Sequence, residues 1–269
     1  MVFVMLLVFE WGGVNKSEKV ATSKYVQNLA TNGDFEKIYN SDLEVYIDLK
    51  DGSIRNAFIM ERVERDGLFK TRLLSDDDFL RFYFKTSVSG FSGGEYKVIQ
   101  QDQTTITLLS EDEVGNKLEK TYSLLDGYIL NISDKLSLAV PSYGAVNIFK
   151  TFYRNKNKSV DYGTAFSRDH LAFSTTEDAF NDESLSSITS RESYLGHWVG
   201  HSQKHFVVAG FDDEVEQKIS LYPQDSNGLF RFGFDEQMLS SSGLMSSNTN
   251  VFIGPKKKEV LETIAPHFK

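Results

Sequence analysis

Apolar and polar residues alternate in short runs along most of the chain, with turn-forming residues between the runs. The clearest example is LEVYIDLKDGSIRNAFI (43–59), in which two alternating runs flank Asp51-Gly52, a dipeptide typical of a β-hairpin. Residues 95–138 predict about four more strands, with turns at 101–103, 115–116 and 126–127. Because each turn can supply a residue that tolerates positive φ, we expect these strands to pair antiparallel.

The second half of the chain continues the strand pattern with weaker turn signals. The strand candidates are 197–211, 215–223 and 228–236, and a serine-rich turn over 240–250 leads to the apolar run VFIG at 251–254. Two segments interrupt the pattern: a charged connection at 66–78 and a long excursion at 160–191, with at most a turn or two of helix near 177–180. The pattern predicts a mainly β protein, built as one large sandwich.

The N-terminal residues MVFVMLLVF form an uncharged apolar run that Trp11 follows closely. The run is too short to span a bilayer, which takes ~20 apolar residues, and it lacks the basic region and cleavage site of a signal peptide. It is either the remnant of a signal anchor, with Trp11 at the membrane interface, or an apolar terminus with no such role. Residues 14–40 are polar without a sustained apolar face and predict a flexible linker.

The C-terminal segment is the only one with a clear helical pattern. Pro255 can open a helix that runs to residue 269. Its apolar stripe consists of Leu261, Ile264, Ala265 and Phe268. Lysines 256–258 fall in the first turn, where the helix dipole disfavours cations. They are either solvated or, if the helix lies against a membrane, in contact with anionic lipid head groups.

Composition narrows the possible functions. The 269-residue chain is 40% hydrophobic, with 21 phenylalanines and 12 tyrosines, so it can bury a substantial core. Its formal charge of −9 repels phosphate backbones, which argues against nucleic acid as a partner. Because the chain has no cysteine, disulfides, thiolate metal sites and cysteine nucleophiles are excluded.

Three histidines at spacings of four, His197, His201 and His205, are the strongest candidates for metal ligands. On a helix they would share one face, and two of them could bind one zinc ion. The local pattern is that of a strand, with Trp198 and Phe206 on the opposite face from the histidines. Since neighbours four apart on a strand lie roughly 13 Å from each other, we expect no metal site here.

Catalytic motifs give no further candidate. The patterns G-x-S-x-G and H-E-x-x-H and the P-loop are absent. The acidic runs at 76–78 and 212–214 fall in predicted turns, where solvation is the simplest explanation. The sequence therefore indicates no catalytic residue and no cofactor.

Four segments resemble, in order, the periplasmic domain of the YidC family of bacterial membrane protein insertases. They are the hairpin 43–59, the strand pair NKLEKTYSLLDGYILNISDKLS (116–137), the segment YLGHWVGHSQKHFVVAGF (194–211) with Gly196, Trp198 and Gly200, and the junction VFIGPKKK (251–258). The resemblance covers roughly residues 41–269. His201 and His205 stand where the family pattern leads us to expect an apolar residue and an aromatic one.

The resemblance implies a domain organisation. Residues 1–13 would be the remnant of an N-terminal membrane anchor, 14–40 the flexible linker and 41–254 a large antiparallel β-supersandwich of the galactose-mutarotase-like type. Residues 255–269 would form a connector helix that leads toward a membrane insertase domain. In this helix Leu261, Ile264 and Phe268 would pack on the sandwich.

The resemblance also implies a function without catalysis. The chain would be the periplasmic domain of an inner-membrane insertase and chaperone that assists the insertion and folding of inner-membrane proteins. Its partners would be the Sec translocon and its accessory subunits, nascent inner-membrane proteins, and membrane lipids near both termini, with no nucleic acid. Trp198, Phe206, Phe230 and Phe232 would be either structural or the lining of a cleft for such partners.

Two alternatives stay open at this point. Mutarotase-like sandwiches can epimerise sugars with a histidine acid and a glutamate base, and His170 or His197 would serve as the acid. A sugar-binding module that depends on Trp198 is the other alternative.

Overall fold

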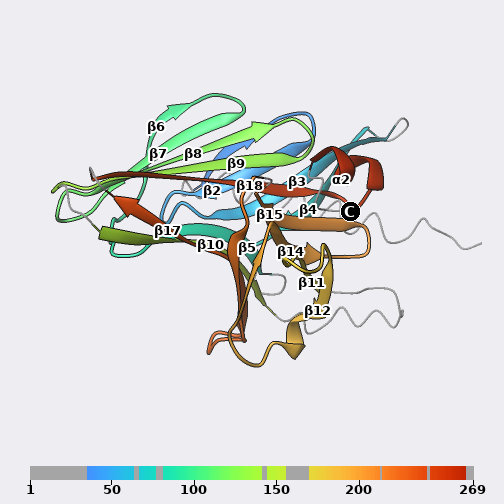
Figure 1. The fold of residues 1–269 in the computed structure, drawn as a ribbon. Coiled ribbons are helices and arrows are strands. Elements are labelled where there is room, and N and C mark those ends of the chain that lie inside the picture. The colour runs from blue at the N-terminus through green and yellow to red at the C-terminus, as the bar shows by residue number, and fades with distance from the viewer. Residues whose placement is uncertain are drawn as a thin grey trace, which may run out of the picture.

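The described part of the chain is an antiparallel β-sandwich. The computed structural model describes residues 35–63, 67–76, 81–140, 144–155, 170–212, 214–240 and 243–264. Within these ranges it contains two sheets of nine strands each and one short C-terminal helix (Figure 1). The predicted fold class, a mainly β sandwich with a C-terminal helix, is confirmed.

The first sheet, sheet A, contains both chain-adjacent hairpins and long-range pairs. Its strands, in spatial order, are β1 (Phe35–Tyr39), β2 (Leu43–Asp48), β3 (Ile54–Val63), β5 (Phe82–Val88), β10 (Gly144–Asn155), β17 (Leu229–Ser240), β16 (Gln217–Tyr222) and β13 (Glu192–Gly196), and β4 (Gly67–Leu74) pairs with β3 beside this path. The longest pairing joins β10 to β17 over the full length of both strands.

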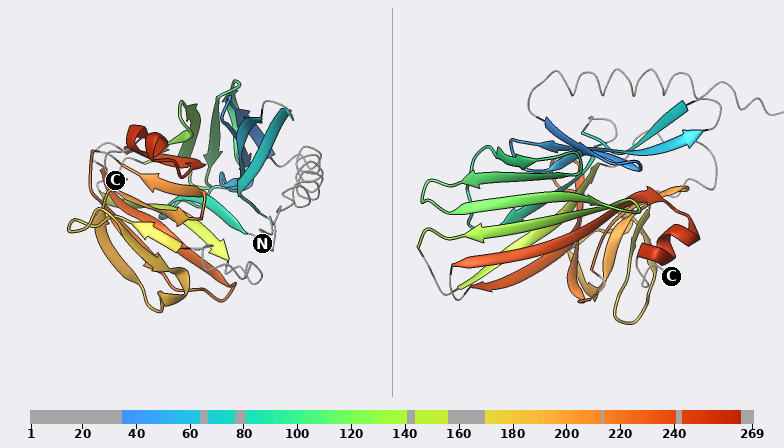
Figure 2. Two further views of the ribbon diagram at one scale, coloured as in Figure 1. Left: turned by 90° about the vertical axis from the view of Figure 1, so that its right-hand side faces the viewer. Right: turned by 90° about the horizontal axis from the view of Figure 1, so that it is seen from above.

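The second sheet, sheet B, ends on a four-stranded meander. Its spatial order is β12 (Asn181–Ser184), β11 (His170–Phe173), β14 (Trp198–Ser202), β15 (Phe206–Phe211), β18 (Leu244–Pro255), β9 (Ile129–Ser137), β8 (Lys117–Leu125), β7 (Thr105–Glu111) and β6 (Lys97–Gln101). A 3₁₀ helix (Leu185–Ser187) follows β12. The helix α2 (Lys258–Ile264) lies at the end of sheet B where β18 terminates (Figure 2).

The main hydrophobic core lies between the two sheets. Alternate residues of β5, for example Phe82 and Phe84, are buried, and the residues between them are only partly so. Phenylalanine rings from three neighbouring strands are in contact in the centre. The ring centroids of Phe84 and Phe152 lie 4.6 Å apart with tilted planes, and those of Phe152 and Phe232 lie 5.2 Å apart with stacked planes. The phenylalanine-rich composition thus supplies the core.

Two buried lysines tie the sheets together. Lys120 of sheet B is fully buried, and its Nζ lies 2.6 Å from Asp134 Oδ1 and 3.1 Å from the carbonyl oxygen of Thr86 in sheet A. Lys150 of sheet A donates to the carbonyl oxygen of Asn248 in sheet B at 2.7 Å. Because a buried charge without partners costs several kcal/mol, both pairs constrain how the sheets stack.

Helix α2 covers part of the outer face of sheet B. Val260 and Leu261 pack against a second buried cluster, which consists of Ala172, Trp198, Val207, Ala209, Phe211 and Phe252. Lys256 anchors the chain just before the helix, with its backbone N–H on the His205 carbonyl oxygen at 2.8 Å. No helix in the described ranges combines the length and the apolar character that crossing a membrane requires.

The strongest sequence signals correspond to observed hairpins. β2 and β3 pair around Gly52, whose φ is +64°, as predicted from Asp51-Gly52. The segment 95–138 contains β6, β7, β8 and β9, all antiparallel. Glycine at a positive-φ turn position, at residues 52, 115 and 127, is the reason that the β2–β3, β7–β8 and β8–β9 hairpins were predictable.

Several predicted loops are strands, and one predicted strand is two. Residues 197–211 form β14 and β15 with a turn between them, and that turn lacks glycine and proline. The predicted serine-rich turn at 240–250 is largely the first half of β18, because Met245, Ser247 and Thr249 alternate into the interior. The charged connection 66–78 contains β4. Residues 177–180 belong to the loop between β11 and β12 and are not helical.

The ends of the sandwich also differ from the predicted boundaries. β1 occupies residues 35–39 inside the predicted linker, because Phe35 packs on a buried Tyr46–Phe58 pair. Pro255 is the last residue of β18, so the helix begins at Lys258 and not at 255. The predicted anchor at 1–13, residues 14–34 of the linker and helix residues 265–269 lie outside the described residues.

Candidate functional site

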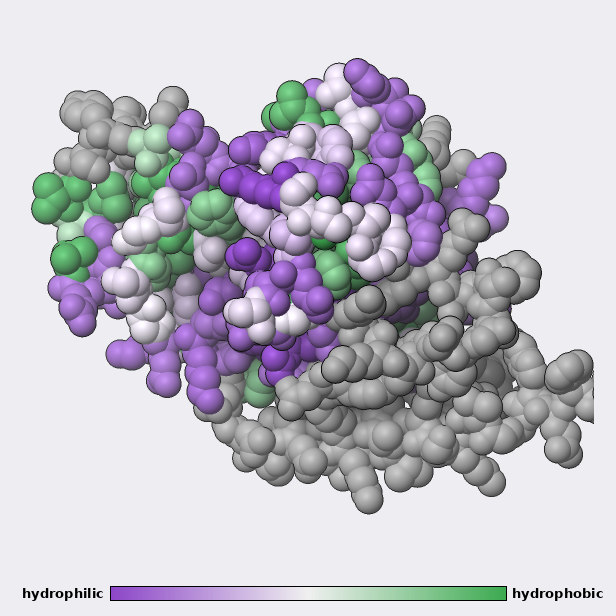
Figure 3. Space-filling model, turned by 90° about the horizontal axis from the view of Figure 1, so that it is seen from below, coloured by the Kyte–Doolittle hydropathy of each residue, from purple (hydrophilic) through white to green (hydrophobic). Residues whose placement is uncertain are grey.

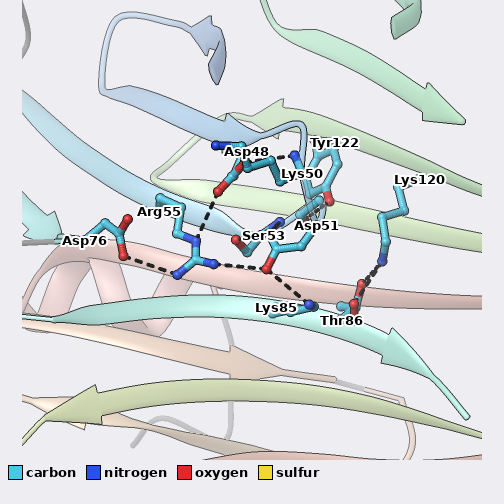
Figure 4. A network of polar contacts seen from close by, with 11 residues as sticks. Asp48, Lys50, Asp51, Ser53, Arg55, Asp76, Lys85, Thr86, Lys120 and Tyr122 are labelled. Carbon is cyan, nitrogen blue, oxygen red and sulfur yellow. Dashed lines mark hydrogen bonds and ion pairs between the residues drawn. The ribbon is translucent and has the colours of Figure 1, made fainter. Parts of the chain in front are cut away.

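A polar network surrounds the turn between β2 and β3 (Figure 4). The turn is fixed by Asp51, whose Oδ1 accepts the backbone N–H of Ser53 at 3.0 Å. Asp51 Oδ2 accepts hydrogen bonds from Arg55 at 3.0 Å and from Lys85 of β5 at 3.1 Å. One turn carboxylate therefore joins the hairpin to the next strand of sheet A.

Arg55 is the residue that connects most of the carboxylates in this network. It forms ion pairs with Asp51 at 3.0 Å, Asp76 at 3.2 Å and Asp48 at 3.5 Å. Burial acts to lower the pKa of Arg55, but Asp51 and Asp76 outweigh it and raise the pKa. Burial likewise opposes ionisation of Asp51, yet the Ser53 hydrogen bond and the charges of Arg55 and Lys85 hold its pKa below the usual value. These ion pairs stabilise the hairpin, although Arg55 Nε is buried without a hydrogen-bond partner.

Arg55 also begins a line of side chains across the outer face of sheet A. Six consecutive positions in the sheet order contribute one residue each, and we call them the arginine–tyrosine row: Arg55 (β3), Tyr83 (β5), Tyr153 (β10), Arg231 (β17), Tyr222 (β16) and Arg191, which precedes β13. Tyr83 pairs with Tyr153 in register, and Arg231 pairs with both Tyr153 and Tyr222. The flanking residues of Tyr83 and Arg231 are core phenylalanines, so these two side chains point away from the core.

The planar groups of the row form two stacked sets, which meet at the cross-strand neighbours Tyr153 and Arg231. The Arg55 guanidinium lies 4.2 Å from the centroid of the Tyr83 ring, and the Tyr83 and Tyr153 rings stack at 4.7 Å with planes 6° apart. The guanidinium groups of Arg231 and Arg191 lie 4.8 and 5.0 Å from the Tyr222 ring. Cation–π and stacking contacts of this kind hold the side chains in fixed positions.

Burial keeps the tyrosines of the row protonated. Burial raises the pKa of Tyr83 and of Tyr153, and in Tyr153 the neighbouring Tyr83 adds to the effect. Burial, followed by the charge of Asp235, raises the pKa of Tyr222. At neutral pH these hydroxyls are therefore hydrogen-bond donors on the sheet face. Seen from below, the described surface is mostly hydrophilic in its middle part, and hydrophobic residues gather at one end (Figure 3).

A second candidate surface is a group of exposed aliphatic residues at the end of the sandwich opposite α2, which we call the apolar tip. Val114, Val140 and Leu244 are 72%, 76% and 61% exposed. Their loops touch: Ala139 donates its N–H to the Asn116 side chain at 3.0 Å, and Leu138 donates to the Gly243 carbonyl oxygen at 2.8 Å. Three exposed aliphatic side chains on adjoining loops make this end a candidate contact surface, because contiguous apolar patches often mark interaction sites.

Burial favours the structural alternative for the aromatic residues that could have lined a cleft. Trp198, Phe230 and Phe232 are 2%, 3% and 0% exposed, so they belong to the core and cannot line a surface cleft. Phe206 is partly buried and packs against the main core at the start of β15. Aromatic residues occur both in protein cores and at contact surfaces, so the sequence alone could not distinguish the two roles.

The helix residues are only partly described. Leu261 packs on the cluster that contains Trp198. Ile264 is the last residue of α2, with a side chain outside the described set, and Phe268 lies outside the described residues.

The histidines occupy separate environments. His201 is buried at 1% exposure and faces Phe82 of sheet A at 5.2 Å, which corrects the prediction of a polar strand face. His197 Nδ1 lies 3.1 Å from the Asp212 carbonyl oxygen, and His170 Nδ1 lies 2.8 Å from Asp182. Among the described residues there is no group of three side chains that could hold a metal ion.

Solved structures with a similar fold define the class of this protein. A galactose mutarotase-like protein from Lactobacillus casei superposes with a TM-score of 0.54 at 8% identity, covering 82% of this chain and 100% of that one. A putative aldose 1-epimerase from Escherichia coli gives a TM-score of 0.52 at 8% identity, covering 82% and 99%. At these identities the likeness establishes the fold alone: a galactose-mutarotase-like sandwich.

Sequence comparison identifies the family within this class. The family model of the YidC periplasmic domain matches residues 36–269, and the chain belongs to this family. Two proteins named membrane protein insertase YidC, from Polynucleobacter asymbioticus and Polynucleobacter necessarius, are 25% and 23% identical over 59% and 60% of this chain. Because the match covers 32% of each, the chain spans about a third of the length of these curated relatives. The resemblance found in the sequence is thereby confirmed.

Proposed function

We propose that this chain is the periplasmic domain of an inner-membrane insertase and assists the insertion and folding of inner-membrane proteins through contact, without catalysis. The observation that carries the proposal is the family match over residues 36–269, a range that includes the described strands of both sheets and α2. Insertion is driven by burial of apolar surface and by the need of each backbone group for an internal partner in the bilayer. The domain then needs a surface for contact and no nucleotide or metal.

The proposed organisation places the membrane at the C-terminal end of the sandwich. Helix α2 is held on sheet B by Leu261 and Val260, at the end of the sandwich away from the apolar tip (Figure 2). We assign residues 1–13 to an anchor remnant, 14–34 to a linker and 255–269 to the connection toward a membrane domain. Lipids would then lie near both termini, and the apolar tip would face clients and translocon subunits.

The sugar-directed alternatives gain no support from the histidines. His170 lies on β11 opposite Ser202, and His197 directly precedes β14. Each is already held by an oxygen of the fold, Asp182 or the Asp212 carbonyl. Trp198, on which a sugar-binding module would depend, is buried.

Affinity purification from native membranes tests the proposal. With the chain tagged in its parent protein and the membranes solubilised in mild detergent, we expect quantitative mass spectrometry to find Sec translocon subunits and their accessory subunits enriched. A periplasmic protein of similar charge with the same tag is the control. Equal recovery of translocon subunits with both baits would contradict the proposal.

A further inference from the structure

The middle of the arginine–tyrosine row differs from its two ends. At one end Arg55 forms ion pairs with Asp48, Asp51 and Asp76. At the other end Arg191 forms an ion pair with Asp235 at 3.0 Å. Within the described residues Arg231, between them, pairs with no carboxylate. Its Nε is buried without a hydrogen-bond partner, as is that of Arg55.

Two further donors lie beside Arg231. Tyr153 is its direct cross-strand neighbour, and Tyr83 stacks on Tyr153. In the part of the chain that the structure describes, neither hydroxyl has a hydrogen-bond partner from the protein. Each hydroxyl is protonated at neutral pH, as is usual for tyrosine, and can donate a hydrogen bond. A cation and two phenolic donors thus face the outside of the sheet, and no described residue supplies an acceptor for them.

We propose that Arg231, with Tyr153 and Tyr83, binds a carboxylate of an extended acidic polypeptide segment on the outer face of sheet A. The other two arginines of the row each bind an aspartate carboxylate, which indicates that a carboxylate is the ligand that fits Arg231. A planar guanidinium matches a carboxylate with two parallel hydrogen bonds. The inference deepens the proposed function, on which it rests, by naming the chemistry of a partner segment.

The net charge of −9 does not prevent this contact. At physiological salt, charges farther away than about 8 Å are largely screened. The acids nearest in the row are neutralised by Arg55, Lys85 and Arg191. An approaching carboxylate therefore meets mainly the positive charge of the Arg231 guanidinium.

Binding of a labelled hexaglutamate peptide to the full chain tests the proposal. Fluorescence anisotropy at physiological salt should show saturable binding of hexaglutamate and none of hexaglutamine. Arg231→Gln should weaken binding roughly tenfold or more, the effect of losing hydrogen bonds to a charged group. Lys135→Gln removes the same charge from an exposed side chain of sheet B and should leave binding unchanged.

A second variant separates binding from folding. Tyr153→Phe keeps the stacked ring and removes only the hydroxyl, so it should weaken binding several-fold with an unchanged thermal midpoint. Arg231→Lys should restore part of the affinity that Arg231→Gln loses. Equal losses in Arg231→Gln and Lys135→Gln, or equal binding of hexaglutamine, would overturn the proposal.

Two further probes distinguish the source of the anion. Inorganic phosphate should compete with hexaglutamate only weakly, and vesicles of phosphatidylglycerol should not bind in an Arg231-dependent manner. Arg231-dependent binding to vesicles without binding to hexaglutamate would overturn the proposal in favour of a lipid head group. If hexaglutamate does not bind but the affinity purification recovers translocon subunits, the carboxylate site is wrong and the proposed function stands.

Discussion

Replacing Lys120 by methionine lowers the free energy of unfolding by about 3–5 kcal/mol, the cost of breaking a buried ion pair on one side. The variant leaves the Asp134 carboxylate, 1% exposed, without its cation in the space between the sheets. It also removes the hydrogen bond from Lys120 to the Thr86 carbonyl oxygen at 3.1 Å, which links sheet B to sheet A. Urea unfolding followed by tryptophan fluorescence measures the loss.

The double variant Lys120→Met, Asp134→Leu is the matched control for this prediction. Because it removes both charges together, no unpaired buried charge is left, and apolar replacements of buried pairs are often close to neutral. We expect the double variant to be more stable than Lys120→Met alone. The single variant Asp134→Leu completes the comparison. If the loss in the double variant equals the sum of the losses in Lys120→Met and Asp134→Leu, the two residues do not form the coupled pair that the structure shows.

The second large effect is expected at the contact between sheet B and helix α2. Trp198→Ala should lower the free energy of unfolding by about 3–5 kcal/mol, because a large buried ring is replaced by a cavity. Trp198 lies in the cluster that Val260 and Leu261 cover, so the helix loses its main contact. Limited proteolysis should then cut near α2 faster than in the wild type.

Phe180→Ala is the control for Trp198→Ala. Phe180 touches the same tryptophan, with ring centroids 5.9 Å apart, but it is 49% exposed. Its truncation removes a contact and creates no enclosed cavity, so we expect a loss of less than about 1 kcal/mol. A Trp198→Ala loss as small as that of Phe180→Ala would show that α2 is not held by this cluster.

The parts of the fold that sequence predicted are those with a local cause. The hairpins at Gly52 and Gly127 follow from residues with φ of +64° and +77°, which glycine adopts without strain. Helix α2 follows from an apolar stripe that is visible without tertiary information, with Leu261 on the sandwich. In both cases a few neighbouring residues determine the conformation.

The parts that sequence missed depend on partners far along the chain. Ser246, Ser247 and Asn248 have a turn-like composition, yet they are strand residues because β9 pairs with them along the ladder. His201 looked like a surface residue of a polar strand face but is buried against Phe82, about 120 positions earlier in the numbering. Propensity gave the wrong result wherever pairing with a distant strand outweighed it.

The arginine–tyrosine row shows the same limit for function. Each member is unremarkable in its own strand, and no motif joins Tyr83 to Tyr153 or Arg231 to Tyr222 in the sequence. The row exists only because β5, β10, β17 and β16 are neighbours in sheet A. The one available signal was a tyrosine or arginine between core residues in several strands, which indicates an outward-facing polar position but not its neighbours.

Site-specific photo-crosslinking at the apolar tip tests the central claim most directly, that this domain works by contact with membrane-protein clients. A photoreactive amino acid would replace Val140 or Leu244 in the parent protein, in native membranes that carry an arrested nascent inner-membrane protein. Leu195, also apolar and 54% exposed but on the edge strand β13, is the control position. We predict crosslinks to the nascent chain from Val140 and Leu244 and none from Leu195. Equal crosslinking from all three positions, or none from any, would contradict the account.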